Sequence, residues 1–97
     1  MKLTGLDKKL VNLEGTELDM TYGKALANVL LIGGKVKFDH HKAYSLSKKF
    51  YDEKEFSMDR PDFKNLKEVI EADGEKEGTF KGSLIYGQLE EYLGAVK

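Results

Sequence analysis

The sequence predicts an α+β fold: a compact single domain of about four short helices with a small antiparallel hairpin or sheet, spanning residues 1–97. Four segments carry apolar residues at the three- and four-residue spacing of a helix face. Between them lie short stretches in which apolar and polar residues alternate near turn formers, as in brief strands. A composition of 40% hydrophobic and 34% charged residues is typical of one globular domain, and the chain has no repeat that would divide it.

The first expected element is a hairpin that contains Leu10, Leu13 and Leu18, with its turn near Glu14–Thr16. A helix follows it directly. Thr21 is a suitable N-cap, because its hydroxyl can accept a hydrogen bond from a backbone N–H of the first turn. The apolar face of this helix is formed by Tyr22, Ala25, Leu26, Val29 and Leu30, and the helix is expected to end at Gly33 and Gly34.

The alternation over residues 35–38 fits either a short strand or a linker. Asp39 is the natural cap of a second helix, expected over residues 40–51. Its apolar face consists of Ala43, Leu46 and Phe50. An acidic turn over residues 52–55 leads to a brief strand at residues 55–58.

A third helix is expected to start at residues 59–62, where Pro61 fits the first turn because its missing N–H has no helical partner there. Its apolar face holds Phe63, Leu66, Val69 and Ile70, and Asp73–Gly74 is expected to end it. Residues 74–79 resemble a polar loop with two glycines. The apolar face of a fourth helix begins at Leu84 or Ile85, continues with Leu89, Tyr92 and Leu93, and closes at Gly94.

Charge and composition exclude several classes of protein. The net charge is −1, with a basic first half and an acidic second half, which argues against nucleic-acid binding by bulk charge. The chain has no cysteine, so it cannot form disulfides or thiolate metal sites. The N-terminus lacks the apolar run of a signal peptide, and no apolar run approaches the length of a membrane span. We therefore expect a cytoplasmic protein without a membrane partner.

The sequence lacks the motifs of catalysis and of cofactor binding. Gly33-Gly34-Lys35 is not preceded by the glycine of a phosphate loop, and no serine lies in a Gly-x-Ser-x-Gly turn. His40 and His41 point about 100° apart on a helix and do not converge on one ion. We expect no enzymatic activity, no catalytic residue, no cofactor and no metal site.

Binding by surface complementarity is the hypothesis that remains. Tyrosine is enriched at protein interfaces because it joins a rigid apolar ring to a polar tip. The tyrosines and lysines of residues 35–51, or the acidic face of residues 52–77, are the candidate contact surfaces. The proposed binding residues are Lys48, Lys49, Tyr44, Tyr51, Glu53 and Glu55.

Several segments together resemble small uncharacterised accessory proteins of tailed phages and prophages. The similarity covers residues 10–93 and rests on Thr21–Leu31 (TYGKALANVLL), Leu46–Tyr51 (LSKKFY), Phe56–Ile70 and Gly87–Glu90 (GQLE). The glycine-rich residues 74–82 depart from it by their length. The resemblance implies a protein made in the cytoplasm of a bacterial host cell, and it carries over no catalytic residue.

We therefore expect a non-enzymatic phage-type accessory protein that binds a host or phage macromolecule, in counter-defence or host takeover, with a protein as its partner. One alternative is a homo-oligomer that encloses a nucleotide-like ligand between its subunits. Another is a nucleic-acid-binding regulator built on the helices of residues 39–72, although Asp39 interrupts the basic stretch and no arginine lies within it.

Stoichiometric zinc should leave the melting temperature of the protein unchanged, because the two histidines cannot share an ion and no cysteine is present. Thermal unfolding with and without zinc measures this, and a stabilising shift would contradict the prediction.

Overall fold

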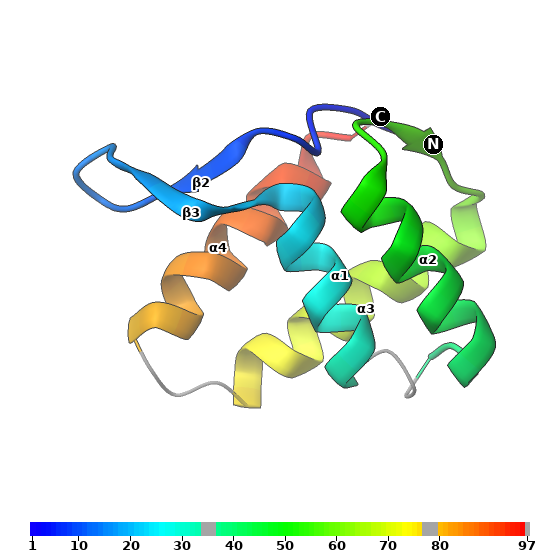
Figure 1. Cartoon of the computed structure of the whole chain (residues 1–97). Coiled ribbons are helices and arrows are strands. Elements are labelled where there is room, and N and C mark those ends of the chain that lie inside the picture. Colours follow the sequence, from blue (N-terminus) through cyan, green and yellow to red (C-terminus); the bar gives the residue numbers. More distant parts are fainter. Residues whose placement is uncertain (34–36, 77–79, 97) are drawn as a thin grey trace.

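Four helices follow one another through the part of the chain that the structure describes, and the N-terminal residues cross one end of them (Figure 1). The computed structural model describes residues 1–33, 37–76 and 80–96. The helices are α1 (Tyr22–Gly33), α2 (His40–Asp52), α3 (Arg60–Lys76) and α4 (Phe80–Gly94). The strands are β1 (Lys2–Leu3), β2 (Lys9–Val11), β3 (Glu17–Thr21) and β4 (Phe56–Ser57). The predicted α+β class is confirmed.

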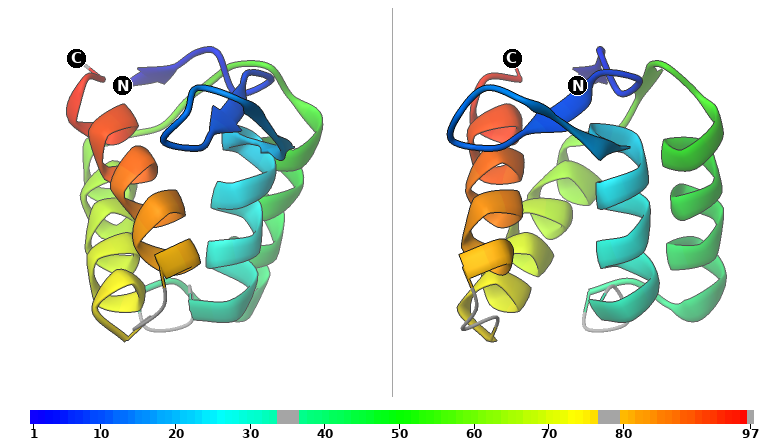
Figure 2. Two further views of the ribbon diagram at one scale, coloured as in Figure 1. Left: turned by 90° about the vertical axis from the view of Figure 1, so that its left-hand side faces the viewer. Right: turned by 60° about the vertical axis from the view of Figure 1, so that its left-hand side comes forward.

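Two small antiparallel sheets lie at the end of the helices that the N-terminal residues cross (Figure 2). The predicted hairpin consists of β2 and β3, with Lys9 opposite Thr21 and Val11 opposite Glu17. Its turn forms where the sequence predicts it: the Asn12 side chain accepts hydrogen bonds from the Glu14 and Thr16 N–H groups. Gly15 has a φ of +85°, which glycine adopts without a Cβ clash.

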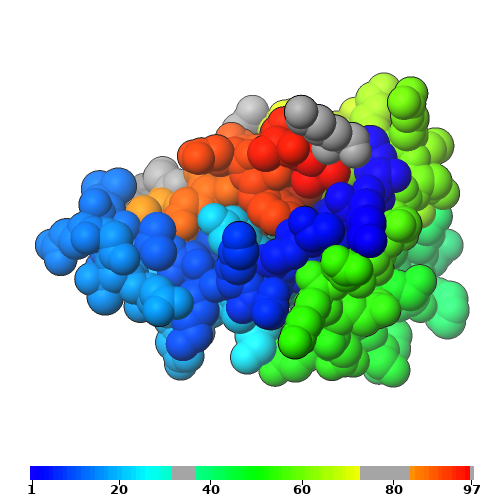
Figure 3. Space-filling view, turned by 90° about the horizontal axis from the view of Figure 1, so that it is seen from above, coloured from blue at the N-terminus to red at the C-terminus, as the bar shows by residue number. Residues whose placement is uncertain are grey.

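The second sheet joins the start of the chain to its middle. β1 pairs with β4, so that Leu3 lies opposite Phe56 and Lys2 opposite Ser57. The strand at Phe56–Ser57 was predicted, but its partner β1 was not, because nothing local to residues 2–3 indicates which distant segment they will meet. Residues 1–11, here called the arm, thereby cross over the helix ends (Figure 3).

Side-chain caps begin three of the helices; the caps Thr21 and Asp39 were predicted, and Asp59 caps the third helix at the start predicted for it. The Thr21 hydroxyl accepts from the Lys24 N–H at 3.1 Å, Asp39 accepts from Lys42 at 2.7 Å, and Asp59 accepts from Asp62 at 2.9 Å. Each bond satisfies one of the N–H groups that a helix start leaves without a partner. The cap residues therefore define where α1, α2 and α3 begin.

The end predicted for the third helix is wrong. α3 continues through Asp73 and Gly74 to Lys76, so residues 74–76 are helical and not part of a loop. A glycine inside a helix costs only about 1 kcal/mol relative to alanine, and the helix formers on both sides of Gly74 carry the helix past it. The remaining predicted loop residues, 77–79, lie outside the described residues, as do Gly34 and residues 35–36.

The core lies between the four helices and the underside of the arm. α1 is its centre, because it contacts α2, α3, α4 and β3. The predicted apolar faces are buried in all four helices, with Tyr22, Ile85 and Tyr92 half-buried at the margin. The arm adds three fully buried leucines, Leu3, Leu6 and Leu10. Phe38 is buried from the linker before α2.

Three backbone segments meet at Gly23, at the start of α1. The Gly23 N–H donates to the Leu6 carbonyl of the arm at 2.9 Å, and a Cβ at this position would lie 2.2 Å from the Phe50 carbonyl oxygen of α2. No real Cβ fits at that distance from a backbone atom. Only glycine therefore allows the arm, α1 and α2 to approach one another this closely.

Gly23→Ala should lower the free energy of unfolding by about 1–3 kcal/mol or more, because the added methyl group forces the α1 and α2 backbones apart. Urea denaturation measures the change. The matched control is Gly87→Ala in α4, where an added Cβ meets nothing within 4 Å. That variant should raise the free energy of unfolding by up to about 1 kcal/mol. Equal effects of the two substitutions would contradict the proposed packing constraint.

Candidate functional site

A shallow cleft runs along the outer surface where α1 and α2 lie side by side. Its α2 wall carries Tyr44, Lys48 and Tyr51, which share one helix face because they are four and three residues apart. Its α1 wall carries Asn28 and Leu31. The cleft has a volume of about 190 Å³. We call it the α1–α2 cleft.

The α1–α2 cleft gathers exposed apolar side chains. Leu31 is 58% exposed, Tyr44 56% and Tyr51 60%. The only other large apolar side chains of comparable exposure among the described residues are Val11 and Leu13 of the hairpin. Single exposed apolar residues need no explanation, but several on one surface mark a candidate contact site.

Two lysines lie over the tyrosine rings of this cleft. The Lys24 ammonium is 5.4 Å from the centre of the Tyr51 ring, and the Lys48 ammonium is 5.6 Å from that of Tyr44. Both distances are within the range of a cation–π interaction. The rings are therefore flanked by positive charge, one lysine coming from each helix.

The structure brings together only part of the predicted binding set. Tyr44, Lys48 and Tyr51 line the α1–α2 cleft, whereas Lys49 does not, because one further residue turns it about 100° around α2. Glu53 is the C-cap of α2, and its N–H donates to the Lys49 carbonyl. Glu55 forms a salt bridge of 3.3 Å with Lys2 beside the β1–β4 sheet. The two glutamates are thus separate from the tyrosines.

The prediction missed the α1 side of this cleft. Lys24, Asn28 and Leu31 are spaced four and three residues apart, so they form a second stripe next to the core stripe of α1. Leu31 is an apolar residue outside the core face, which is the signal that could have found it. Leu31 lies beside Tyr44 because of the way α1 and α2 pack together. The spacing of residues along the sequence does not show this packing.

Other cations of the basic stretch are paired with acids of α3. Lys37 forms a salt bridge of 2.9 Å with Glu68, and Lys42 one of 2.7 Å with Asp62. The hydrogen bond from Lys37 lowers the pKa of Glu68, and the hydrogen bond to Asp62 raises the pKa of Lys42. These lysines therefore hold α3 to its neighbours and leave less positive charge for a ligand.

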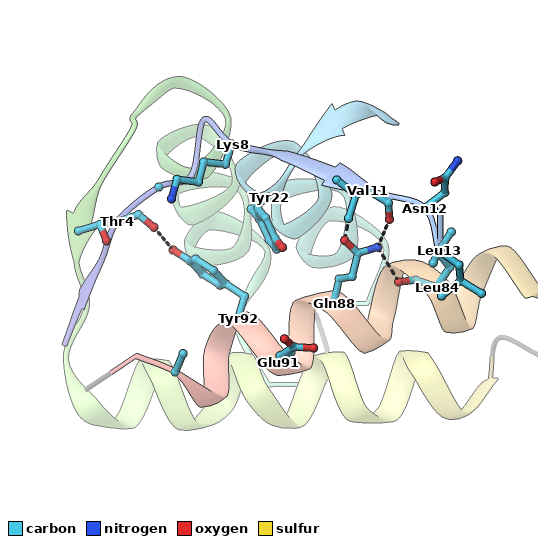
Figure 4. Close-up of a pocket in the computed structure, with 12 residues that line it drawn as sticks. Thr4, Lys8, Val11, Asn12, Leu13, Tyr22, Leu84, Gln88, Glu91 and Tyr92 are labelled. Carbon is cyan, nitrogen blue, oxygen red and sulfur yellow. Dashed lines mark hydrogen bonds between the residues drawn. The ribbon is translucent and has the colours of Figure 1, made fainter. Parts of the chain in front are cut away.

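A second and larger hollow lies between the arm with its hairpin and α4 (Figure 4). We call it the hairpin groove, and its volume is about 750 Å³. Tyr22 and Tyr92 are stacked on one another in it, with ring centres 4.9 Å apart. The Tyr92 hydroxyl donates to the Thr4 carbonyl at 2.6 Å. The groove is thus built by residues from opposite ends of the chain.

Gln88 connects α4 to the hairpin in the same groove. Its side-chain oxygen accepts from the Val11 N–H at 3.0 Å, and its side-chain nitrogen donates to the Val11 carbonyl at 2.6 Å (Figure 4). One side chain thereby pairs with both backbone groups of a residue in β2, as a neighbouring strand would. The groove therefore has a fixed width at this point.

The side chains that line the two surfaces are not those of a metal centre. Within the described ranges, no three histidine or acidic residues are grouped so that they could hold a metal ion. None of the helices described is long and apolar enough to cross a membrane. What the two surfaces offer is aromatic rings, apolar side chains and separate charges, which are the means of binding by contact.

The fold and these surfaces define a small α+β domain with two candidate binding sites. Comparison with protein-family models, with curated proteins and with solved structures gives no match for this chain. The phage resemblance expected from the sequence therefore stays a prediction.

The stability of the protein should depend on Tyr92 at high pH. Burial and the neighbouring Tyr22 raise the pKa of Tyr92 from 10.0 to about 12. Between these values the unfolded chain releases the proton while the folded chain keeps it, so the free energy of unfolding should fall as pH rises. Below pH 10 the Tyr92 hydroxyl is neutral in both the folded and the unfolded chain, so its full contribution to the free energy of unfolding is present.

Tyr92→Phe should remove this part of the pH dependence and cost about 0.5–1.5 kcal/mol at neutral pH through the lost bond to Thr4. Urea denaturation across the alkaline range measures both effects. Tyr51→Phe is the control, because that ring is exposed and its hydroxyl makes no hydrogen bond with the described residues. If Tyr92→Phe left the pH dependence of the free energy of unfolding unchanged, Tyr92 would not be the group that causes it.

Proposed function

We propose that this protein is a non-enzymatic, phage-type accessory protein that binds a partner protein through the α1–α2 cleft. The observation that carries the proposal is the grouping of three exposed apolar side chains, Leu31, Tyr44 and Tyr51, between two exposed lysines. Aromatic residues surrounded by polar ones are the usual composition of an interface centre and its rim.

The shape of the α1–α2 cleft favours a helix as its occupant. Lys24 and Leu31 of α1 are seven positions apart, which is a rise of about 10 Å or two helical turns. An amphipathic helix contacts such a surface through apolar residues at positions i, i+3 or i+4, and i+7. The length of the cleft therefore suits about two turns of a partner helix.

The charge of the α1–α2 cleft favours an acidic partner. Lys24 and Lys48 flank the rings, and among the described residues the one acid that lines the cleft is Asp52 at the end of α2. Glutamate or aspartate next to the apolar positions of the partner helix would meet these ammonium groups, which speeds association and selects the partner. The proposed partner is thus a protein with an acidic amphipathic helix.

The alternative of a nucleic-acid-binding regulator has less support. A phosphate backbone needs several cations on one surface. Lys37 and Lys42 are bound to acids of α3, and Lys48 and Lys49 point to different sides of α2. These pairings favour protein binding over the binding of phosphates.

Photo-crosslinking in bacterial cells tests the proposal. A photoreactive amino acid replaces Tyr44 in one variant and Lys64 in the control, where Lys64 is exposed on α3 and does not line the cleft. We expect a crosslink only from position 44, to a peptide of acidic amphipathic sequence, in cells infected with or carrying a phage. Lys24→Glu with Lys48→Glu should reduce its yield about tenfold or more, because both charges become repulsive.

Other results would contradict the proposal. Three results would each exclude the α1–α2 cleft as an interface for an acidic helix. The first is a crosslink to nucleic acid, and the second is an equal crosslink yield at positions 44 and 64. The third is a crosslink yield that the two lysine-to-glutamate substitutions leave unchanged. A ligand of less than a kilodalton, retained in native mass spectra of the purified protein, would support the small-molecule alternative instead.

A further inference from the structure

The hairpin groove is not used by the proposed function, and its form is elongated. Beyond Tyr92 it continues into a second hollow of about 350 Å³, with which it shares Thr4, Tyr92 and Ala95. That hollow also contacts Lys2 and Val96. The arm forms one wall along this length and α4 the other (Figures 3 and 4). An extended chain suits such a groove better than a compact ligand does.

One end of the hairpin groove is apolar. Leu13 at the hairpin turn is 83% exposed, and Val11 of β2 and Leu84 of α4 lie beside it. Figure 4 shows Leu13 and Leu84 close together at this end. The domain leaves this apolar surface uncovered, so an apolar side chain of a ligand would remove it from water.

The middle of the hairpin groove carries an ammonium group on its arm side, that of Lys8, and a carboxylate on its α4 side, that of Glu91 (Figure 4). Glu91 of α4 lines it and makes no ion pair with any described residue. The Tyr22 hydroxyl makes no hydrogen bond with any described residue either, and the stacked Tyr22 and Tyr92 rings line the same groove. A guanidinium group binds both a carboxylate and an aromatic face.

Strand addition is blocked at the point where the ligand would pass. Gln88 already pairs with both backbone groups of Val11, so a ligand chain cannot extend the β2–β3 sheet there. Its side chains, and not its backbone, must supply the contacts. The recognition would therefore depend on which side chains the ligand presents.

We propose that the hairpin groove binds an extended segment of a partner protein that carries a basic side chain near an apolar one. The basic group lies against Glu91 and the tyrosine pair, and the apolar group contacts Leu13 and Leu84. This site is separate from the α1–α2 cleft and does not depend on the function proposed for it.

A labelled peptide, Ala-Arg-Ala-Leu-Ala, is the probe. Arginine and leucine are two residues apart, so they point to the same side of an extended chain. The matched probe replaces arginine by citrulline, which keeps the shape without the charge. Binding is followed by NMR chemical shifts of the isotope-labelled protein, which report both affinity and location. We expect shifts at Leu13, Gln88 and Glu91 with the arginine probe, and weaker binding of the citrulline probe.

Three charge variants make the test specific. Glu91→Gln should weaken binding of the arginine probe about two- to fivefold, the effect of one exposed ion pair. Lys8→Gln should strengthen it by a similar factor, because Lys8 is a cation on the arm side of the groove. Glu90→Gln is the control, an exposed carboxylate on α4 that does not line the groove, and it should change nothing.

Several outcomes would overturn the proposal. These are an absence of shifts in the groove, equal binding of the arginine and citrulline probes, or equal effects of Glu91→Gln and Glu90→Gln. Shifts of the same groove residues on raising the concentration of the protein alone would show that a second copy of this chain, and not a partner segment, occupies the groove.

Discussion

The contact at Gly23 is the constraint on which the rest of the structure depends. There the first turn of α1 lies directly against the last turn of α2 and against the arm, and the Phe50 and Leu6 carbonyl oxygens both lie close to where a Cβ of residue 23 would be. This approach sets the distance between α1 and α2, which in turn brings Lys24 over Tyr51 and Leu31 beside Tyr44. It also places the arm over the helix ends, so that Leu6 and Leu10 close the core.

Both candidate surfaces arise from the central position of α1. Because one face of α1 meets α3 and α4, its stripe of Lys24, Asn28 and Leu31 is left on the outside next to α2. Tyr22, at the start of the same helix, reaches instead towards α4 and stacks on Tyr92. One helix thus contributes to two surfaces that differ in charge: lysines flank the first, and the second holds Lys8 and a carboxylate, Glu91, that forms no ion pair with the described residues.

Elements that depend on contacts between residues close in the sequence could be predicted. Elements that depend on contacts between residues far apart in the sequence could not. The caps at Thr21, Asp39 and Asp59 bind N–H groups three residues away, so their chemistry is visible in a short segment. The partner of β1 lies more than fifty residues along the chain, and the Gln88–Val11 pair is 77 residues apart. For the same reason Tyr44, Lys48 and Tyr51 were predicted together, being on one helix, whereas Leu31 and Lys24 were missed, being on another.

The bonds between the arm and α4 have a consequence for the order in which the protein folds during its synthesis. The arm is made before α4, but Thr4 and Val11 bind Tyr92 and Gln88, residues that are made 88 and 77 positions later. Until α4 emerges, the apolar side chains of the arm have only part of their final surroundings. Part of this leucine-containing segment therefore stays exposed until α4 has been made, and apolar surface that is exposed during folding favours aggregation.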